Sequence, residues 1–432
     1  MIKTVKIISL AALVCAAGAN AAEKEKSEDS SESALKTGLE LDVSVGLGYD
    51  SNIYRAPDSP YINFADACST DNTDPQFDPN CDASANGNPN DTNGYVFVDP
   101  KVQSGMFIPA ELALEYVDDL NQKNYLVTSY KFDGEFYTDS KYDNANNYAH
   151  KFRIGNEHVF RSAGSKVNSL YAGGLFEHKK RLYLDRDTGE EQTSSGNVDV
   201  SNRYTYDALG IEADYKNRIS KLQYDIEAVW SVRDYEDPVE VSQYDHTYYR
   251  LGGDVKYQVA KPTKLTFGYK FYVYDYSERP SRSADGRLLK SNPTRKYDYN
   301  VFDITLRHRF SESWLAYFDY ERKTRDDKYV GYDNYTKDLF KVRLHYDINK
   351  NNKIKVSYAY WERDYPNAYA FDNQAIGIPK EYDGTDLKVS STTKLDKNKS
   401  VVVDFKYADE NTTDLRYDYD RYKVFVSFQW VN

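Results

Sequence analysis

The segment 421–432 at the C-terminal end alternates between two kinds of position. One parity carries large apolar side chains, namely Tyr422, Val424, Val426, Phe428 and Trp430. The other parity carries Lys423, Ser427 and Gln429, with Phe425 and Val431 among them. Alternation with a period of two residues predicts a β-strand with one apolar face. Such a strand in a very polar chain is explained if it closes a barrel whose outer face contacts lipid.

The same alternation recurs along the chain, for example at 222–232, 265–273, 340–346 and 401–407. Compact polar turns alternate with long connections rich in Asp, Asn, Tyr, Gly and Pro. This rhythm predicts an all-β fold: a transmembrane, antiparallel, up-and-down barrel of about sixteen strands, with short periplasmic turns and long extracellular loops. Its last strand would pair with the first, near 39–49. A soluble sandwich or propeller is the alternative.

Composition excludes several other classes. Beyond the N-terminal segment, no run of about 18 apolar residues exists that could form a membrane-spanning helix. Disorder is disfavoured because the chain holds 42 Tyr and 15% aromatic residues. The net charge of −12 argues against nucleic acid as a partner.

The first residues have the features of a signal peptide. Lys3 and Lys6 precede an apolar stretch at 7–17, and Ala19, Asn20 and Ala21 form a small-x-small cleavage site. We expect residues 1–21 to be removed, with cleavage after Ala21 or one residue later. Lipidation at Cys15 is disfavoured because no small residue stands just before it.

The predicted organisation places the mature chain in the outer membrane of a Gram-negative cell. Residues 22–37 form a polar periplasmic tail, too short for the plug domain of a TonB-dependent transporter, and residues 38–432 form the barrel. A long first extracellular loop covers 53–94. Its Cys68 and Cys81 predict a disulfide in an oxidising compartment. The many Asp residues of this loop leave two readings open, a solvated acidic loop or a calcium site.

The alternation also identifies candidate residues for the interior of the barrel, because residues between the apolar positions of each strand face away from lipid. The charged candidates are Arg233, Arg250, Asp254, Lys270, Asp303, Arg307, Arg309, Asp319, Lys341, Arg343, Arg363 and Lys423. The aromatic candidates are Tyr272, Tyr274, Tyr317 and Trp361. The charges form either a solvated wall of mutually paired groups or opposed acidic and basic rows that orient polar solutes. The aromatic residues either provide a path for glycans or reflect the general abundance of Tyr.

Catalytic signatures are missing from the sequence. The six His residues are scattered, and neither a Gly-x-Ser-x-Gly elbow nor a His-Glu-x-x-His motif occurs. We expect no enzymatic activity, no cofactor and no metal. A hydrolase assembled from residues on different strands is an alternative, although a less favoured one.

Residues 48–57, Gly-Tyr-Asp-Ser-Asn-Ile-Tyr-Arg-Ala-Pro, follow the first predicted strand. This stretch resembles the "GYDSN" opening of the outer-membrane proteins known as the β-barrel porin 2 family. The resemblance is specific over these residues, and elsewhere it covers only size, strand rhythm and the C-terminal strand. It implies a barrel linked to secretion of exopolysaccharide, and it supplies no catalytic residues. The chain departs from the usual barrel terminus because its last residue is Asn432, not an aromatic residue.

These features together predict a porin-like channel for export or passage of polysaccharide or oligosaccharide. The alternatives are a general diffusion porin for small polar solutes and a structural or adhesive barrel plugged by its loops. Expected partners are outer-membrane lipid, lipopolysaccharide, polysaccharide and the assembly machinery that recognises the C-terminal strand.

Overall fold

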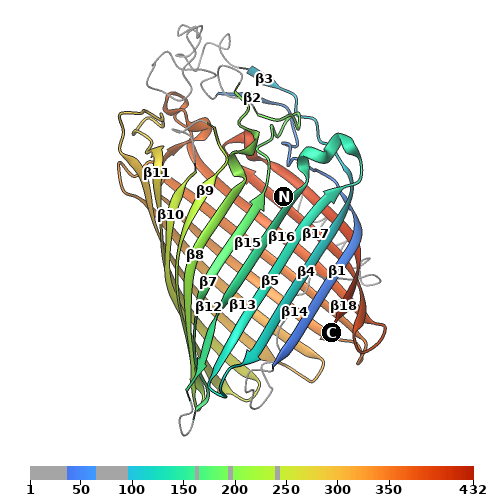
Figure 1. Ribbon diagram of the computed structural model, residues 1–432. Coiled ribbons are helices and arrows are strands. Elements are labelled where there is room, and N and C mark those ends of the chain that lie inside the picture. The colour runs from blue at the N-terminus through green and yellow to red at the C-terminus, as the bar shows by residue number, and fades with distance from the viewer. Residues whose placement is uncertain (1–36, 65–95, 161–164, 193–197, 239–243) are drawn as a thin grey trace.

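The computed structural model describes the chain as a closed barrel of antiparallel strands (Figure 1). The described residues are 37–64, 96–160, 165–192, 198–238 and 244–432. The predicted class, an up-and-down transmembrane barrel of sixteen strands, is confirmed. A barrel of this size encloses space beyond what its own side chains fill.

The barrel strands follow one another in chain order around the wall. They are β1 (Gly38–Asp50), β4 (Gly105–Asp119), β5 (Asn124–Tyr137), β6 (Asn147–Val159), β7 (Ser165–Lys180), β8 (Tyr206–Ile219), β9 (Leu222–Tyr235), β10 (His246–Ala260), β11 (Thr263–Pro280), β12 (Thr294–Arg309), β13 (Trp314–Asp327), β14 (Tyr335–Asp347), β15 (Asn352–Tyr369), β16 (Pro379–Lys394), β17 (Lys399–Thr412) and β18 (Tyr419–Val431). Each strand pairs with its neighbours in the chain, so backbone hydrogen bonds are satisfied within the wall.

The barrel closes where the first strand meets the last, as predicted. β1 and β18 pair antiparallel from Asp42 opposite Val431 to Asp50 opposite Lys423. Glycines on β1 allow a close approach at this seam: a Cβ at Gly48 would lie 2.4 Å from Cβ of Phe425. Closure leaves no unpaired strand edge in lipid.

One face of the wall consists of exposed apolar side chains. Leu47 on β1, Ile211 on β8 and Leu251 on β10 are 52%, 62% and 58% exposed. Burying such a band in hydrocarbon is favourable, whereas leaving it in water is costly. This face is therefore the lipid-facing side, and the alternate residues face the interior.

The two ends of the barrel differ in the length of their connections (Figure 1). At the short-turn end, side chains close the turns: Asn349 Oδ1 accepts hydrogen bonds from the backbone N–H groups of Asn351 and Asn352, at 2.8 and 2.9 Å. Asp396 makes the same arrangement in the turn after β16. This is the turn chemistry expected of Asn and Asp.

The opposite, long-loop end carries the remaining secondary structure. Two short strands, β2 (Tyr61–Asn63) and β3 (Val96–Val98), pair with each other above the barrel. Among the described residues, the loops contain the 3-10 helices η3 (Ser140–Ala145), η4 (Ser201–Tyr204), η6 (Ala370–Asp372), η7 (Gln374–Ile376) and η8 (Leu415–Tyr417). The first connection runs from 51 to 104, beyond both ends of the predicted loop 53–94. Within the described residues, no helix is both long and apolar enough to cross a membrane.

Candidate functional site in the barrel interior

The strand register places all of the predicted charged and aromatic candidates on the inner face. An ion pair identifies this face directly: Lys423 Nζ on β18 lies 2.7 Å from Glu135 Oε2 on β5, although β1 and β4 separate these strands in the wall. Only side chains that point into the barrel can meet across two intervening strands. The other candidates follow from the register of each strand pair.

Charge is distributed unevenly around the interior. The inner face of β11–β15 is mainly basic, with Lys264, Lys270, Arg295, Arg307, Arg309, Lys323, Arg325, Lys337, Lys341, Arg343, Lys353, Lys355 and Arg363 against Asp303, Asp319, Glu321, Asp327 and Asp347. The inner face of β1, β4 and β5 is mainly acidic, with Glu40, Asp42, Asp50, Glu111, Glu115, Asp133 and Glu135 against Lys131. In the strand order these two regions lie across the barrel from each other. Such opposed walls create a transverse field in the lumen.

Several inner charges are also paired on their own wall. Arg343 holds Asp319 with two hydrogen bonds of 2.9 and 3.0 Å, and its guanidinium lies 4.3 Å from the ring centre of Tyr317. Arg250 Nη2 lies 3.0 Å from Glu227 Oε2 on the neighbouring strand. Local pairs therefore neutralise part of each wall, and the excess charge remains on opposite sides.

Aromatic side chains form a continuous inner layer towards the long-loop end. Tyr272 and Tyr299 stack with ring centres 4.5 Å apart, and Tyr274 lies 5.2 Å from Tyr299. The layer continues through Tyr335 to Tyr365, 5.5 Å apart. Tyr272 and Tyr299 stand directly opposite each other in the register, and the rings of Tyr299 and Tyr335, 6.3 Å apart, meet beside Arg325 of the intervening strand β13. We name Tyr272, Tyr299, Tyr335 and Tyr365 the aromatic row.

Sequence reasoning missed several residues of this interior. Lys323, Arg325 and Lys337 share the parity of the predicted Asp319 and Lys341 on β13 and β14, so the alternation alone could have found them. Tyr299 and Tyr335 were missed in the same way. Which residues of other strands lie beside them depends on the register between strands. The alternation within one strand gives no information about that register.

A buried charge network lies at the seam of the barrel. The carboxylate of Asp50 is fully buried and accepts a hydrogen bond of 2.8 Å from Arg421 Nε and one of 2.6 Å from the Tyr137 hydroxyl. Lys423 Nζ lies 3.5 Å from the same carboxylate and also pairs with Glu135. These contacts join β1, β5 and β18, so they fix the closing strands to the wall beside them.

The stretch that carries the family resemblance folds over this network. Asn52 is buried, and its side chain closes a turn by accepting from the backbone N–H of Ala56 and donating to the backbone carbonyl of Ala56, both at 2.8 Å. Tyr54 then packs on Tyr142 of η3, with ring centres 6.2 Å apart. The segment after β1 is thus part of the apolar cluster that also contains Phe107.

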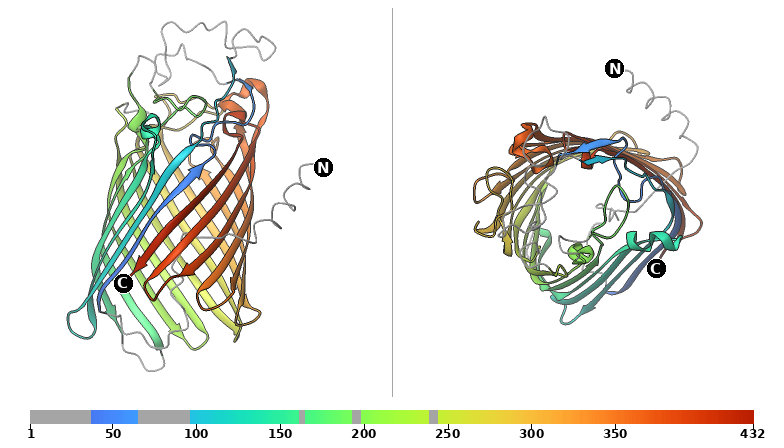
Figure 2. Two further views of the ribbon diagram at one scale, coloured as in Figure 1. Left: turned by 90° about the vertical axis from the view of Figure 1, so that its right-hand side faces the viewer. Right: turned by 90° about the horizontal axis from the view of Figure 1, so that it is seen from above.

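A second loop enters the mouth of the barrel from the wall at β7 and β8. We name its described residues, 181–192 and 198–205, the crossing loop. Figure 2, seen from above, shows its green ribbon inside the ring of strands. Asp187 accepts hydrogen bonds from Lys101 N at 2.9 Å and from the Tyr61 hydroxyl at 3.1 Å. At Gly189, where φ is +79°, an added Cβ would lie 2.2 Å from the Tyr54 ring. The crossing loop is therefore anchored to the first connection and narrows the lumen.

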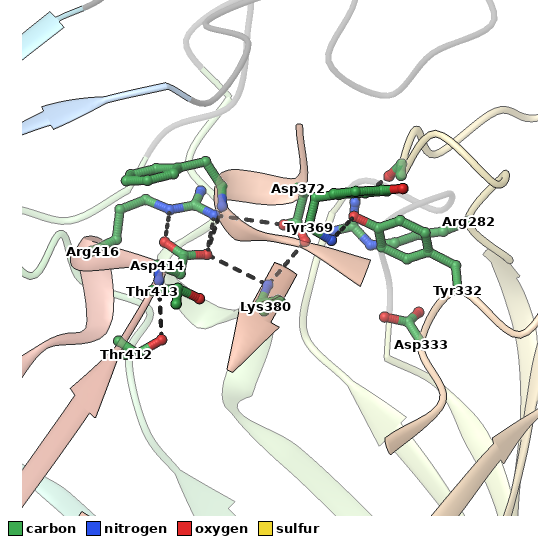
Figure 3. Close-up of polar contacts among 12 residues, drawn as sticks. Arg282, Tyr332, Asp333, Tyr369, Asp372, Lys380, Thr412, Thr413, Asp414 and Arg416 are labelled. Atoms are coloured by element: carbon green, nitrogen blue, oxygen red, sulfur yellow. Dashed lines mark hydrogen bonds and ion pairs between the residues drawn. The ribbon is translucent and has the colours of Figure 1, made fainter. Parts of the chain in front are cut away.

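Ion pairs join three of the long loops into a mouth network, which we define as Arg282, Asp372, Lys380, Asp414 and Arg416 (Figure 3). Asp372 contacts Arg282 at 3.2 Å and Lys380 at 2.9 Å. Asp414 contacts Arg416 at 2.7 Å and Lys380 at 3.5 Å. Burial by itself would raise the pKa of Asp372, but the three surrounding cations outweigh it and hold this pKa well below its ordinary value. The network connects the loops after β11, β15 and β17.

We expect Asp372→Asn to loosen the long loops without unfolding the barrel. Because the pKa of Asp372 is lowered, its stabilising contribution is complete above about pH 4 and is lost as the pH falls through the lowered value. Limited proteolysis should therefore find the parent loops equally protected at about pH 5 and about pH 7, and the variant cleaved faster at both. Asp285→Asn is the matched control, because Asp285 pairs only locally with Arg287 at 2.8 Å. Equal cleavage of both variants would contradict a role for the network.

Three histidines on the outer face each contact one polar side chain: His150 lies 2.8 Å from the Tyr130 hydroxyl, His178 lies 2.9 Å from Asp207, and His308 lies 2.9 Å from the Thr263 hydroxyl. The rings of His150 and His178 lie 6.0 Å apart. Among the described residues, no group of three or more His, Cys, Asp or Glu side chains is placed to hold a metal ion. Ala21, Cys68, Cys81 and the acidic part of the first loop lie outside the described residues. The signal peptide, disulfide and calcium hypotheses therefore stay predictions.

Comparisons with known proteins add similarities of fold. No family model matches the sequence, and no curated protein matches it. OmpT of Vibrio cholerae is 10% identical with a TM-score of 0.43, over 92% of this chain and 99% of that chain. A bacterial polysaccharide outer membrane secretin is 9% identical with a TM-score of 0.44, over 91% and 97%. OccAB3 of Acinetobacter baumannii is 7% identical with a TM-score of 0.43, over 91% and 99%. The resemblance to the β-barrel porin 2 family stays a prediction.

Proposed function

We propose that the protein is an outer-membrane channel through which polysaccharide or oligosaccharide chains pass. The observation that carries the proposal is the aromatic row on the inner wall, with charged side chains on either side. Sugar rings present C–H faces that stack on aromatic rings, and their hydroxyl groups pair with charged side chains. The mechanism is passive: solutes follow an aqueous path past fixed side chains. The exposed apolar face would contact lipid and lipopolysaccharide, and β18 would be recognised during assembly.

A second candidate function has its own observation. The crossing loop and the mouth network occupy the long-loop end, which would suit a structural or adhesive barrel that conducts poorly. A general diffusion porin is the third possibility. Planar-bilayer recordings separate the three, because a plugged barrel shows no conductance and a general porin conducts without block by sugars.

The aromatic row makes the glycan proposal testable by substitution. We expect neutral oligosaccharides to block the current, and the double variant Tyr272→Ala and Tyr365→Ala to weaken this block about 30-fold, since each stacking contact contributes on the order of 1 kcal/mol. Tyr249→Ala is the matched control, because this Tyr lies on β10 with its side chain on the lipid-facing side, 45% exposed. Block that persists unchanged in the double variant would exclude the aromatic row as the sugar path.

A further inference from the structure

Three cations lie side by side on neighbouring strands of the inner wall. Lys323 on β13 stands directly opposite Lys337 on β14, and Lys337 stands directly opposite Arg363 on β15. Directly opposed residues have Cβ atoms about 5 Å apart, and like charges in such pairs are destabilising. We name these three residues the basic row. Its arrangement costs stability in the free barrel.

The structure compensates this charge only partly. Among the described residues, neither Lys323 nor Lys337 has a carboxylate within ion-pair distance. Arg363 has one distant contact, with Nη2 3.9 Å from Glu410 Oε1, and its buried Nε has no hydrogen-bond partner. All three side chains are half-buried, so each keeps a surface towards the lumen. The basic row thus retains the capacity to bind an anion.

Aromatic rings fix the positions of these cations without neutralising them. Lys337 Nζ lies 3.9 Å from the ring centre of Trp361, and Lys323 Nζ lies 5.1 Å from that of Tyr299. The Arg363 guanidinium lies 4.2 Å from the ring centre of Tyr382. Cation–π contacts of this kind restrict the side chains but leave their charge available. The row is therefore preorganised for a ligand, which lowers the entropic cost of binding.

The basic row runs beside the aromatic row. On β14 and β15, each strand places its basic-row residue two positions from a residue of the aromatic row: Lys337 from Tyr335, and Arg363 from Tyr365. Positions two apart on a strand project to the same face. A ligand with both an anionic group and a sugar ring can therefore contact the two rows at once, whereas a small inorganic anion can use only one of them.

We propose that the basic row and the aromatic row together form a subsite for an acidic sugar residue, with its carboxylate on Lys323, Lys337 and Arg363 and its ring beside the tyrosines. This inference rests on the proposed glycan path and narrows its substrate to anionic chains. The opposed acidic wall on β1, β4 and β5 repels the same anion, so it directs the chain towards the basic wall.

The experiment compares oligogalacturonate with a neutral malto-oligosaccharide of equal length as blockers of the reconstituted full-length barrel. We expect oligogalacturonate to block at a concentration at least about tenfold lower, and the double variant Lys323→Gln and Lys337→Gln to remove this preference while block by the neutral sugar persists. The variant should also withstand higher temperature than the parent without ligand, because the opposed charges are gone. Inorganic sulfate should not reproduce the block.

The matched control is Lys264→Gln with Lys355→Gln, which removes the same charge from the basic wall near the short-turn end. Equal loss of preference in both double variants would overturn the subsite and leave only the general field of the wall. Block by both sugars at equal concentration would overturn the subsite while the glycan path stands. Absence of block by either sugar would overturn the proposed function and the subsite with it.

Discussion

Replacing residues 182–204 with a short Gly-Ser linker should raise the single-channel conductance of the reconstituted barrel severalfold. The crossing loop lies inside the ring of strands, and its anchors are contacts with the first connection, such as Asp187 with Tyr61. Sixteen strands enclose an aqueous channel when no loop fills it. Planar-bilayer recordings provide the measurement, and the shift of the folded barrel on unheated gels confirms that the variant has assembled.

A milder variant separates the position of the crossing loop from its presence. Gly189→Val keeps every other residue, but its φ of +79° disfavours a β-branched side chain, and the new Cβ would meet the Tyr54 ring. We expect an intermediate conductance with frequent flickering, because the loop is released without being removed. Conductance unchanged in both variants would show that the crossing loop does not obstruct the path.

Asp50→Ala should produce the largest loss of stability among single substitutions in the barrel. The variant leaves the buried Arg421 guanidinium without its carboxylate and removes one of the two partners of Lys423. Removing one partner of a buried ion pair costs about 3–5 kcal/mol in the free energy of unfolding. Guanidinium unfolding of the barrel in detergent, followed by tryptophan fluorescence, measures this difference.

The neighbouring Asp420 provides the matched control for Asp50. It lies on β18 next to Arg421, but its exposed side chain is not part of the buried network, so Asp420→Ala should change the free energy of unfolding by less than about 0.5 kcal/mol. In an Arg421→Met background, Asp50→Ala should cost much less than in the parent, because the partner is already gone. Strictly additive effects would contradict the proposed coupling across the seam.

Much of the fold follows from local chemistry that can be seen along the chain. Period-two alternation assigns each residue of a strand to one of two faces. It predicts that Arg343 and Asp319 both face the interior, where they form a bidentate contact. Asn349 and Asp396 favour tight turns through their own side chains, and this separated the two ends of the barrel. The pairing of β1 with β18 then follows from the need to leave no free edge.

The candidate site was only partly predictable for a physical reason. Parity places Lys337 on the inner face, but its position opposite Lys323 and Arg363 depends on how far each strand is shifted against the next. A shift of two residues preserves every face and changes every such neighbour. Trp361 was predicted as an aromatic wall residue, yet its contact with Lys337 at 3.9 Å appears only once the register is known.

The sequence by itself determined the class of the molecule: alternation, turn chemistry and polarity leave a closed barrel as the structure that satisfies its backbone and its apolar face. Only the tertiary structure decided what the interior presents. The crossing loop folds inward because it contacts residues that are distant in the sequence, such as Tyr54 and Tyr61. The basic row exists because three strands align in one register. The arrangement of the interior therefore depends on contacts between residues far apart in the chain, and a local sequence pattern does not specify those contacts.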